Sequence, residues 1–513
     1  MIKSIFIIFL FFSIINGYSQ PTRSDANGNF EMGNYDIALQ QYLKLLKHEK
    51  DNVEFNYKLG LSYLRSEIDK AAAIPYLEFA QKDPKTNNSI KFDIALAYYH
   101  AFKFDTAITI LNNYKNSGID DSIKNKVDEK IKTINIAKNM AAHPVNVKLI
   151  NVGEEINTKR AEYNPFVSED ETYLYYTSNK KYISDFQELV SGIYMSKGVN
   201  GKWEKMKSLG TAINTDESII LIGVSKDGNT IYSQPESFSF DMNIFYSTQA
   251  RGRFKEVLEL TKDINSKGVE CGASISNTGD TLYFASNKEG GYGGMDIYFS
   301  LKLPNGDWGT PQNAGIDINS KFNENYPEIS RDGKRIYFCS DGYNSMGGYD
   351  IYFCRLGEDG KWSKPKNLGY PINDTYDNLT ISLCGNDRYG YISLTRPEGY
   401  GDKDIYKVIF NNIDVQEIIY KGKIACGDSL KSIHLIDIDP EISISVFNKD
   451  NGDLYGTYNY IQSSGKFIFS LEPGRYEIVI EGDSYLPYRK EFEILEGVYA
   501  EREYNLNIYL KKK

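Results

Sequence analysis

The chain is poor in the residues that build metal and redox centres. It has 5 cysteines and 4 histidines among 513 residues. A structural zinc site needs four Cys or His ligands held close together. The histidines are His48, His100, His143 and His434, and none has a Cys or His partner at ligand spacing. The sequence therefore predicts no zinc site, and no other metal, cofactor or catalytic residue is expected.

Positive charge is also scarce. Lys plus Arg number 59 against 69 for Asp plus Glu, which gives a formal net charge of -10. No Lys/Arg-rich run or basic helix stands out in the sequence. Binding to nucleic acid requires a cationic face that displaces counterions. Nucleic acid is therefore not an expected partner.

Long apolar runs are missing after the first twenty residues, which read MIKSIFIIFLFFSIINGYSQ. Lys3 precedes an apolar run from Ile5 to Ile15, and small residues follow at Gly17 and Ser19. This order predicts a signal peptide over residues 1–19. The run is shorter than the roughly 20 residues that a spanning helix needs. No Cys lies at the cleavage site for acylation, so we expect an exported, periplasmic chain without direct membrane insertion.

Residues 22–142 show a helical period of about 34. Ala38, Ala72 and Ala107 are 34 and 35 residues apart. Small residues at this period, with larger apolar side chains four residues later, are typical of tetratricopeptide (TPR) repeats. Those later residues are Tyr42, Tyr76 and Leu111. The region is predicted to form three repeats and a charged helix at about Asp121 to Ala141 that caps the stack.

Between residues 145 and 410 the period changes to about 54. Ile-Asn pairs place asparagines at Asn157, Asn214, Asn265, Asn319 and Asn373. Hairpin turns such as SKDGN and SRDGK follow, and each leads into an aromatic strand. Four strands per unit, repeated radially, predict a β-propeller. Five blades are expected, and six is the alternative.

The fifth unit lacks its outer strand, and a stray strand precedes the first unit. The segment Val145 to Pro165 matches the end of a unit and contains its own Ile156-Asn157 pair. We expect this segment to pair with the last blade and close the ring, which removes exposed sheet edges.

Residues 415–513 no longer repeat. Alternating apolar and polar residues with Gly/Asp turns predict an antiparallel β-sandwich. The run GKFIFSLEPGRYEIVIEGDSYLPY resembles the carboxypeptidase regulatory-like domain, which implies a transthyretin-like fold without catalytic residues of its own.

Several segments contain residue types found in phosphate-binding, catalytic or calcium-binding sites, but their sequence context favours a structural role. The loop Gly290 to Gly294 is rich in glycine but joins two strands, whereas a phosphate-binding loop leads into a helix. Asp296, Asp350 and Asp404 recur once per unit, so we interpret them as hydrogen-bond acceptors at strand starts and not as converging catalytic acids. The segment Asp450 to Asp453 is predicted to form a turn, since it lacks the ligands of a calcium loop.

Two cysteines occupy repeat positions for small side chains. Cys339 replaces residues such as Thr177, and Cys354 replaces residues such as Ser196. In the predicted hairpin Cys339 lies near Asp350, so the two sulfurs should be too far apart to bond.

The middle units resemble the WD40-like PD40 repeat of TolB-type propellers, most clearly from Pro327 to Tyr352. The order of TPR, PD40 propeller and regulatory-like sandwich resembles the PorE-like family of Bacteroidota. That resemblance implies a periplasmic, outer-membrane-associated role in type IX secretion or gliding motility. Relatives continue into an OmpA-like domain that does not follow here, so peptidoglycan binding is not expected. The implied partner is a PorP/SprF-type outer-membrane β-barrel or another component of the secretion machinery.

Three functions follow as hypotheses. The first is a non-catalytic scaffold that binds other proteins through the helical repeats and the propeller. The second is a glycan- or cell-wall-binding propeller that uses aromatic residues around its mouth. The third is a hydrolase or lyase with a site at the propeller centre. No Gly-x-Ser-x-Gly elbow is present to support a peptidase.

Overall fold

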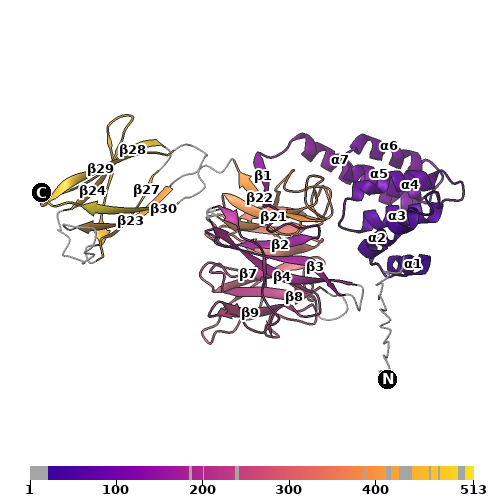
Figure 1. The fold of residues 1–513 in the computed structure, drawn as a ribbon, viewed down its shortest axis with the longest axis horizontal. Helices are drawn as coiled ribbons and strands as arrows, with labels where there is room; N and C mark the ends of the chain where they lie inside the picture. Colours follow the sequence, from indigo (N-terminus) through magenta and orange to yellow (C-terminus); the bar gives the residue numbers. More distant parts are fainter. Residues whose placement is uncertain are drawn as a thin grey trace, which may run out of the picture. The chain divides into compact units, whose positions relative to one another are not determined.

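The computed structural model describes residues 21–183, 188–199, 201–236, 242–384, 387–411, 418–426, 442–461, 464–471, 474–494 and 503–513. The predicted signal peptide and His434 lie outside these ranges. The chain divides into two compact units, Met1–Lys138 and Asn139–Lys513. Helices build the first unit and β-sheets the second (Figure 1).

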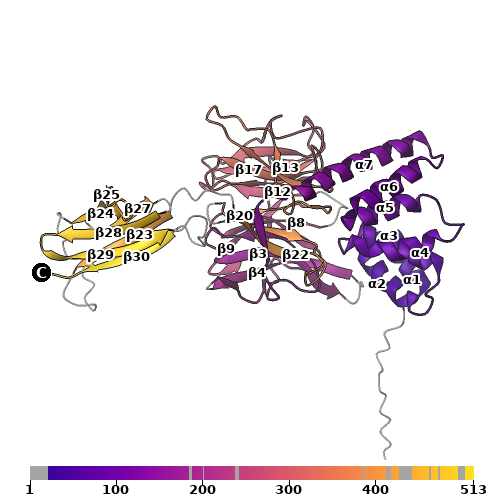
Figure 2. The same ribbon diagram turned by 90° about the horizontal axis from the view of Figure 1, so that it is seen from above.

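The helices follow one another in pairs, α1 with α2, α3 with α4 and α5 with α6, and α7 comes last (Figures 1 and 2). Turns with positive φ at Gly33 and Phe102 separate the members of the first and third pairs. Thr22 caps α1 by accepting a hydrogen bond from the Asp25 N–H at 3.1 Å. The elements are α1 (Arg23–Glu31), α2 (Tyr35–Leu46), α3 (Val53–Arg65), the 3₁₀ helix η1 (Lys70–Ala73), α4 (Ile74–Gln81), α5 (Ile90–His100), α6 (Phe104–Lys115) and α7 (Asp121–Ala142).

Small residues lie where paired helices cross, but the predicted register of the second pair is wrong by one residue. Ala73 and Leu77 are fully buried there, whereas Ala72 and Tyr76 are only partly buried. A Cβ added at Gly60 would lie 2.5 Å from Leu77 Cδ2, so glycine permits this close approach. The shift arises because η1 precedes α4, and a 3₁₀ turn advances the chain by three residues per turn instead of 3.6.

Helix α7 has the predicted extent and buries Val127, Ile134 and Ala137. It lies beside α6 in both views (Figures 1 and 2), and two ion pairs join the helices. Lys115 contacts Asp128 at 2.6 Å and Lys138 contacts Asp105 at 2.5 Å. Within the described ranges, no helix has both the length and the hydropathy needed to cross a bilayer.

Five antiparallel sheets make up the repeated part of the second unit, which agrees with the predicted five blades. Blade 1 contains β2 (Glu162–Val167), β3 (Tyr173–Ile183), β4 (Glu188–Val199), β5 (Lys202–Trp203) and β6 (Lys207–Ser208). Blade 2 contains β7 (Ile219–Val224), β8 (Thr230–Pro235), β9 (Phe245–Ala250), β10 (Arg253–Phe254) and β11 (Leu258–Glu259). Blade 3 contains β12 (Glu270–Ile275), β13 (Thr281–Ser286), β14 (Asp296–Leu301) and β15 (Gln312–Asn313).

Blade 4 contains β16 (Glu324–Ile329), β17 (Arg335–Ser340), β18 (Asp350–Arg355) and β19 (Lys366–Asn367). Blade 5 contains β20 (Ser382–Cys384), β21 (Tyr389–Leu394), β22 (Asp404–Phe410) and β1 (Val147–Asn151). The outer strands β15 and β19 are shorter than the sequence suggested. Pro311 and Pro365 lie next to these strands, and proline has no N–H to donate to a ladder.

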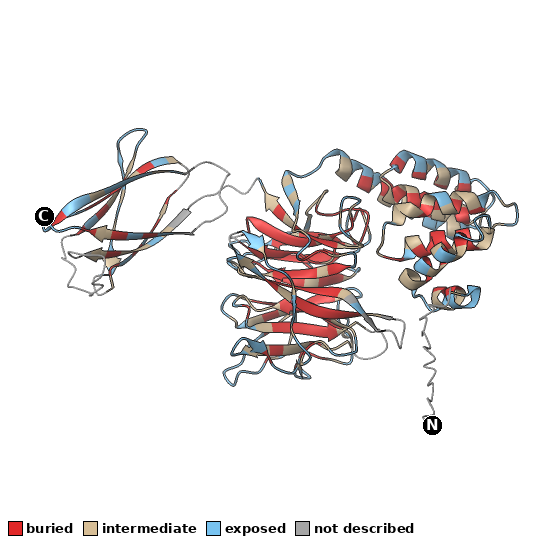
Figure 3. Ribbon diagram, in the orientation of Figure 1, coloured by how far each residue is buried: buried red, intermediate tan, exposed pale blue. Residues whose placement is uncertain are grey.

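Hydrophobic clusters join each blade to the next, so the sheets form a closed ring. One cluster lies at each of the five joints, and buried residues run through the strands of the propeller (Figure 3). Representative buried pairs across the joints are Phe166 with Leu221, Ile222 with Leu282, Ile297 with Ile336, Ile351 with Ile392, and Ile405 with Leu174.

One asparagine per blade holds the backbone of the third strand. Each side-chain oxygen accepts the N–H of an isoleucine, and each side-chain nitrogen donates to the C=O of that same isoleucine, at 2.7–3.0 Å. The carboxamide thus supplies the acceptor for the isoleucine N–H and a second donor for its C=O, which also accepts a backbone N–H in each blade. The pairs are Asn157 with Ile405, Asn214 with Ile193, Asn265 with Ile244, Asn319 with Ile297 and Asn373 with Ile351.

Closure of the ring follows the predicted pattern. Strand β1 pairs antiparallel with β22, with Val147 opposite Phe410 and Asn151 opposite Tyr406. Asn157 then bonds Ile405, which lies 248 residues away in the chain. Residues before the first blade therefore complete the last one.

The C-terminal region forms a sandwich of two sheets, ordered β26-β27-β23-β30 and β25-β24-β28-β29, around one hydrophobic cluster. The prediction of purely antiparallel pairing is wrong, because β23 and β30 pair in parallel. The rest of the sandwich connects these two strands, so no tight hairpin constrains their direction. The strands are β23 (Ile418–Cys426), β24 (Ser443–Asn448), β25 (Leu454–Tyr458), β26 (Tyr460–Ile461), β27 (Lys466–Leu471), β28 (Gly474–Gly482), β29 (Tyr485–Ile494) and β30 (Glu503–Leu510).

Asn157→Ala should destabilise the propeller by about 1–3 kcal/mol. The change leaves the buried N–H of Ile405 without its side-chain acceptor, and an unpartnered group of this kind costs roughly 1–3 kcal/mol. The Ile405 C=O keeps the Val152 N–H as a donor at 3.3 Å. Urea unfolding followed by tryptophan fluorescence measures the loss. Lys148→Ala, at an exposed position of β1, is the control and should leave the midpoint unchanged. Equal midpoints for both variants would contradict a role of Asn157 in closure.

Candidate functional sites

The three repeated aspartates do not converge; each holds its own loop and its own outer strand. Asp350 accepts from the Met346 N–H at 2.9 Å, the Gly347 N–H at 3.2 Å and Asn367 Nδ2 at 2.7 Å. Asp296 accepts the same set of bonds from Tyr292, Gly293 and Asn313. Asp404 accepts from the Tyr400 N–H and from Asn151 Nδ2. Local capping explains all three residues.

A second buried carboxylate occupies the joint between neighbouring blades. Glu162 in β2 accepts from the Thr158 N–H, the Thr158 hydroxyl and the Ser178 hydroxyl at 2.7–2.8 Å. Glu324 accepts the matching set from Ser320 and Ser340 at 2.7–2.9 Å. The sequence reasoning missed these glutamates, although their spacing of three units and the Ser that follows each after the same interval could have identified them.

Burial sets the proton affinity of these acids. Burial raises the pKa of Glu162 to about 7, although the Thr158 and Ser178 donors oppose the shift. Burial likewise raises the pKa of Asp350 to about 7 against the Met346 and Asn367 donors. Raised pKa values also occur in catalytic acids. Here the oxygens already accept three bonds each, so the acids serve to join the loops to the blades.

The glycine-rich loops are sites of close backbone approach. A Cβ added at Gly293 would lie 2.2 Å from the Phe322 O of the next connecting loop. Gly347 and Gly401 have the same relation to Tyr376 O and Thr158 O, each at 2.3 Å. These loops pack against the segment that leads into the next blade and do not precede a helix, which favours the structural interpretation over a phosphate site.

Cys271, Cys339, Cys354 and Cys384 are buried and free. Cys339 faces Ile351 and Cys354 faces Ile336 in the hairpin of β17 and β18. The register is one residue from the predicted partner Asp350, and the conclusion that these cysteines are not bonded to each other is confirmed. Burial raises the pKa of the Cys354 thiol to about 12, which keeps it protonated and unreactive.

The remaining candidates for metal binding do not form a site. Among the residues described, no group of three or more His, Cys, Asp or Glu side chains could hold a metal ion. His48 lies in the turn after α2, His143 directly follows the end of α7, and both are exposed. Burial, with Lys70 and Lys130 nearby, lowers the pKa of His100 well below its usual range. Asp450 pairs with Arg475, whose Nε lies 2.7 Å away, in a turn with Gly452 at φ 77°.

A cavity of about 190 Å³ opens at the propeller mouth beside the hairpin turns. Phe166, Tyr175 and Val224 line its apolar wall. Two ion pairs border it, Lys226 with Glu328 at 2.6 Å and Arg331 with Glu169 at 3.7 Å. Each ion pair joins two different blades, blade 2 with blade 4 and blade 4 with blade 1, so this proximity could not be read from the sequence.

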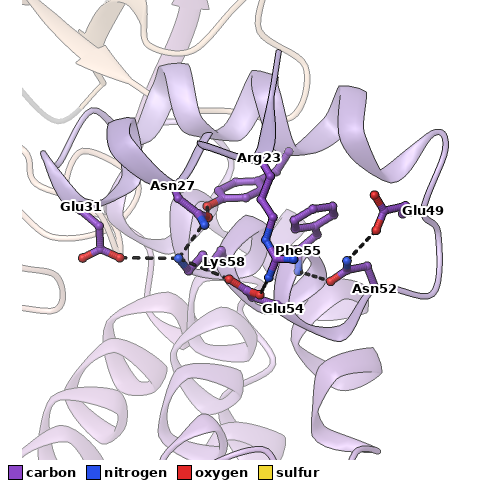
Figure 4. Close-up of polar contacts among 9 residues, drawn as sticks. Arg23, Asn27, Glu31, Glu49, Asn52, Glu54, Phe55 and Lys58 are labelled. Carbon is purple, nitrogen blue, oxygen red and sulfur yellow. Dashed lines mark hydrogen bonds and ion pairs between the residues drawn. The ribbon is translucent and has the colours of Figure 1, made fainter. Parts of the chain in front are cut away.

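A polar cluster covers α1 and α3 of the helical unit (Figure 4). Tyr42 donates to Asn27 Oδ1 at 2.6 Å, and Lys58 Nζ reaches the same oxygen at 3.1 Å. Lys58 also lies 3.5 Å from Glu31 and 3.7 Å from Glu54. Arg23 pairs with Glu54 and stacks on Phe55, with 5.5 Å between the guanidinium carbon and the ring centroid.

The cluster balances two positive and two negative charges on a solvent-facing surface. Side-chain exposure is 58% for Arg23 and 72% for Glu31, whereas Lys58 retains only 18%. Exposed ion pairs contribute little to stability. Arg23 and Glu31 can therefore exchange their internal partners for groups on another molecule at small cost. The arrangement suits recognition by complementary polar contacts.

Lowering the pH from 8 to 5 should stabilise the protein. The folded-state pKa values of Glu162 and Asp350, each about 7, exceed the roughly 4 of the unfolded chain. Their contribution to stability is complete below pH 4 and is lost as the pH rises through 7, by at most about 1.4 kcal/mol per pH unit for each proton. Urea titrations from pH 5 to 8 measure this slope.

Glu162→Gln and Asp350→Asn should each flatten the pH dependence. Glu358→Gln removes an exposed carboxylate from a turn and controls for the change in net charge. A wild-type slope that persisted in both buried variants would show that other groups cause the effect.

Comparison with known proteins gives likeness of structure only. No family model and no curated protein matches the sequence. A protein of Agrobacterium tumefaciens described as TolB is 17% identical, covers 51% of this chain and 96% of its own, and has a TM-score of 0.27. An α-L-arabinofuranosidase from Lactobacillus brevis is 14% identical, with coverage of 50% and 91% and a TM-score of 0.33. A glycosyl hydrolase from Bacteroides ovatus is 7% identical, with coverage of 49% and 84% and a TM-score of 0.32. At these values the matches bear on neither activity nor ligand.

Proposed function

We propose that this protein is a non-catalytic scaffold that binds other proteins in the periplasm, in association with the outer membrane. The observation that carries the proposal is the engagement of the repeated acids. Asp296, Asp350 and Glu162 each accept three hydrogen bonds from the fold itself. Acids that are used to hold loops are not available to transfer protons to a substrate.

The finer family assignments belong to the same proposal. We assign the helix pairs to TPR-type repeats, because Ala38, Gly60 and Ala107 lie fully buried or closely packed at helix crossings. We assign the blades to the PD40 type from their repeated turn and Asp-Ile-Tyr strand. The sandwich is assigned to the carboxypeptidase regulatory-like type. TPR and propeller modules both present large surfaces for proteins.

The polar cluster on α1 and α3 is proposed as one contact surface. Its charges are balanced, and Arg23 and Glu31 are exposed, as protein recognition by complementary charge requires. The resemblance of the motif order to the PorE-like family suggests the class of partner, namely a component of type IX secretion or gliding machinery. A PorP/SprF-type β-barrel of the outer membrane is the proposed partner.

Exchanging the charges of one exposed pair tests the surface. Arg23→Glu combined with Glu54→Arg keeps the internal ion pair and reverses the sign of the charge that a partner would contact at each position. We expect this variant to lose at least one protein that co-purifies with the tagged wild type from detergent-solubilised envelopes, as quantified by mass spectrometry. Lys115→Asp combined with Asp128→Lys exchanges the α6–α7 pair in the same way and should retain all partners.

Two results would overturn the proposal. One is that no protein co-purifies with the wild type. The other is that the purified protein sediments with isolated sacculi, which would indicate binding to the cell wall. Retention of every partner by the Arg23/Glu54 variant would exclude the polar cluster as the contact surface.

A further inference from the structure

A hollow on the propeller lies between blades 2 and 3, beside the hairpin turns, and has a volume of about 520 Å³. That volume lies within the range of roughly 300–1,000 Å³ that small-ligand sites occupy. We call it the blade 2–3 groove. It adjoins the mouth cavity, since Ser225, Lys226 and Asp227 line both.

A buried hydroxyl without a partner faces this groove. Tyr232 in β8 is 5% exposed and lines the hollow. No hydrogen bond to its oxygen occurs among the described residues, yet that oxygen is not among the atoms sealed from solvent. A buried polar group without a partner costs free energy unless water or a ligand satisfies it. The hydroxyl is therefore positioned to bond a molecule in the groove.

Hydroxyl groups dominate the rest of the lining. Tyr246 lies opposite Tyr232 in the β8–β9 pair, and Thr230 lies opposite Thr248. The side-chain oxygens of these residues make no hydrogen bond within the described part of the chain. Thr261 adds another hydroxyl at the outer end. A hydroxyl both donates and accepts, so this lining complements a ligand that carries many hydroxyls.

Charge narrows the class of ligand. Asp227, Glu259 and Asp307 place three carboxylates around the groove. Two lysines, Lys302 and Lys226, carry the positive charges of the lining. The Nζ of Lys302 lies 5.6 Å from the ring centroid of Trp308. The charge of Lys226 is neutralised by Glu328, which lies 2.6 Å away. An anionic ligand would meet net repulsion, whereas carboxylates accept readily from neutral hydroxyls.

Strand topology argues against a peptide. Both β8 and β9 are hydrogen-bonded on each side, to β7, to each other, and to β10 and β11. Neither β8 nor β9 has a free edge, so an extended peptide could not pair with these two strands, and β11, which has one, is only two residues long. We therefore infer that the blade 2–3 groove binds a neutral saccharide. This inference is independent of the proposed scaffold function.

A single-atom change tests the inference. Tyr232→Phe removes the hydroxyl and keeps the ring. Tyr176→Phe is the matched control, because Tyr176 occupies the same position in blade 1 but its unpartnered oxygen is sealed from solvent. Isothermal titration of the full chain uses cellotriose, maltotriose, xylotriose and chitotriose as neutral probes, and trigalacturonate as the acidic probe.

We expect at least one neutral trisaccharide to bind saturably and to quench the fluorescence of Trp308. Tyr232→Phe should weaken that binding roughly three- to tenfold, the usual effect of one neutral hydrogen bond. Tyr176→Phe should leave it unchanged, and Thr248→Ala should weaken it in a second, independent variant. Melting temperatures confirm that each variant is folded.

Three results would overturn the inference. The first is that no neutral probe binds at millimolar concentration. The second is equal affinity of the Tyr232 and Tyr176 variants. The third is binding of trigalacturonate alone, which would show that Lys302 selects an anion. A protein that binds saccharide and no other protein would leave the inference standing while removing the scaffold proposal.

Discussion

A carboxamide that bonds the N–H and the C=O of one isoleucine recurs once in every blade, and the propeller depends on it. In three blades the bond continues into a chain of side chains. Asn319 donates to Asn313, which donates to Asp296, and Asp296 accepts two N–H groups of the glycine-rich loop. Each link satisfies a buried polar group that would otherwise cost roughly 1–3 kcal/mol. A packed loop, an outer strand and a third strand are thereby tied together.

Closure uses the same network with residues from the other end of the chain. Asn157 donates to Asn151, and Asn151 donates to Asp404 in the last blade. Gly401 meets the backbone at Thr158, as Gly347 meets Tyr376 one joint earlier. The contacts between blades 5 and 1 are therefore the same as those at the other joints, although the residues that make them lie at opposite ends of the propeller sequence. The entropy cost of closing such a long loop is met by one complete set of repeat contacts.

The sequence allowed the repeated features to be predicted, because each recurs at a fixed period. The Ile-Asn pairs, the aspartates and the closing segment all follow the expected pattern. What the sequence could not show depends on local geometry or on contacts between units. The shift from Ala72 to Ala73 needs the 3₁₀ helix η1, and the parallel pairing of β23 with β30 needs the whole sandwich. The mouth cavity and the blade 2–3 groove each combine residues of different blades.

Repetition also separates the residues that maintain the fold from those that are free to bind. A side chain that recurs in several blades is explained by a bond it makes in each of them, as the asparagines show. Tyr232 departs from this pattern. Blades 3 and 4 place Phe284 and Phe338 at its position, and those rings stack on Tyr298 and Tyr352 without needing a hydroxyl. Blade 1 places Tyr176 there, but the Tyr176 oxygen is sealed from solvent, whereas the Tyr232 oxygen opens onto the blade 2–3 groove. The hydroxyl of Tyr232 is therefore the one among these side chains that a ligand can reach.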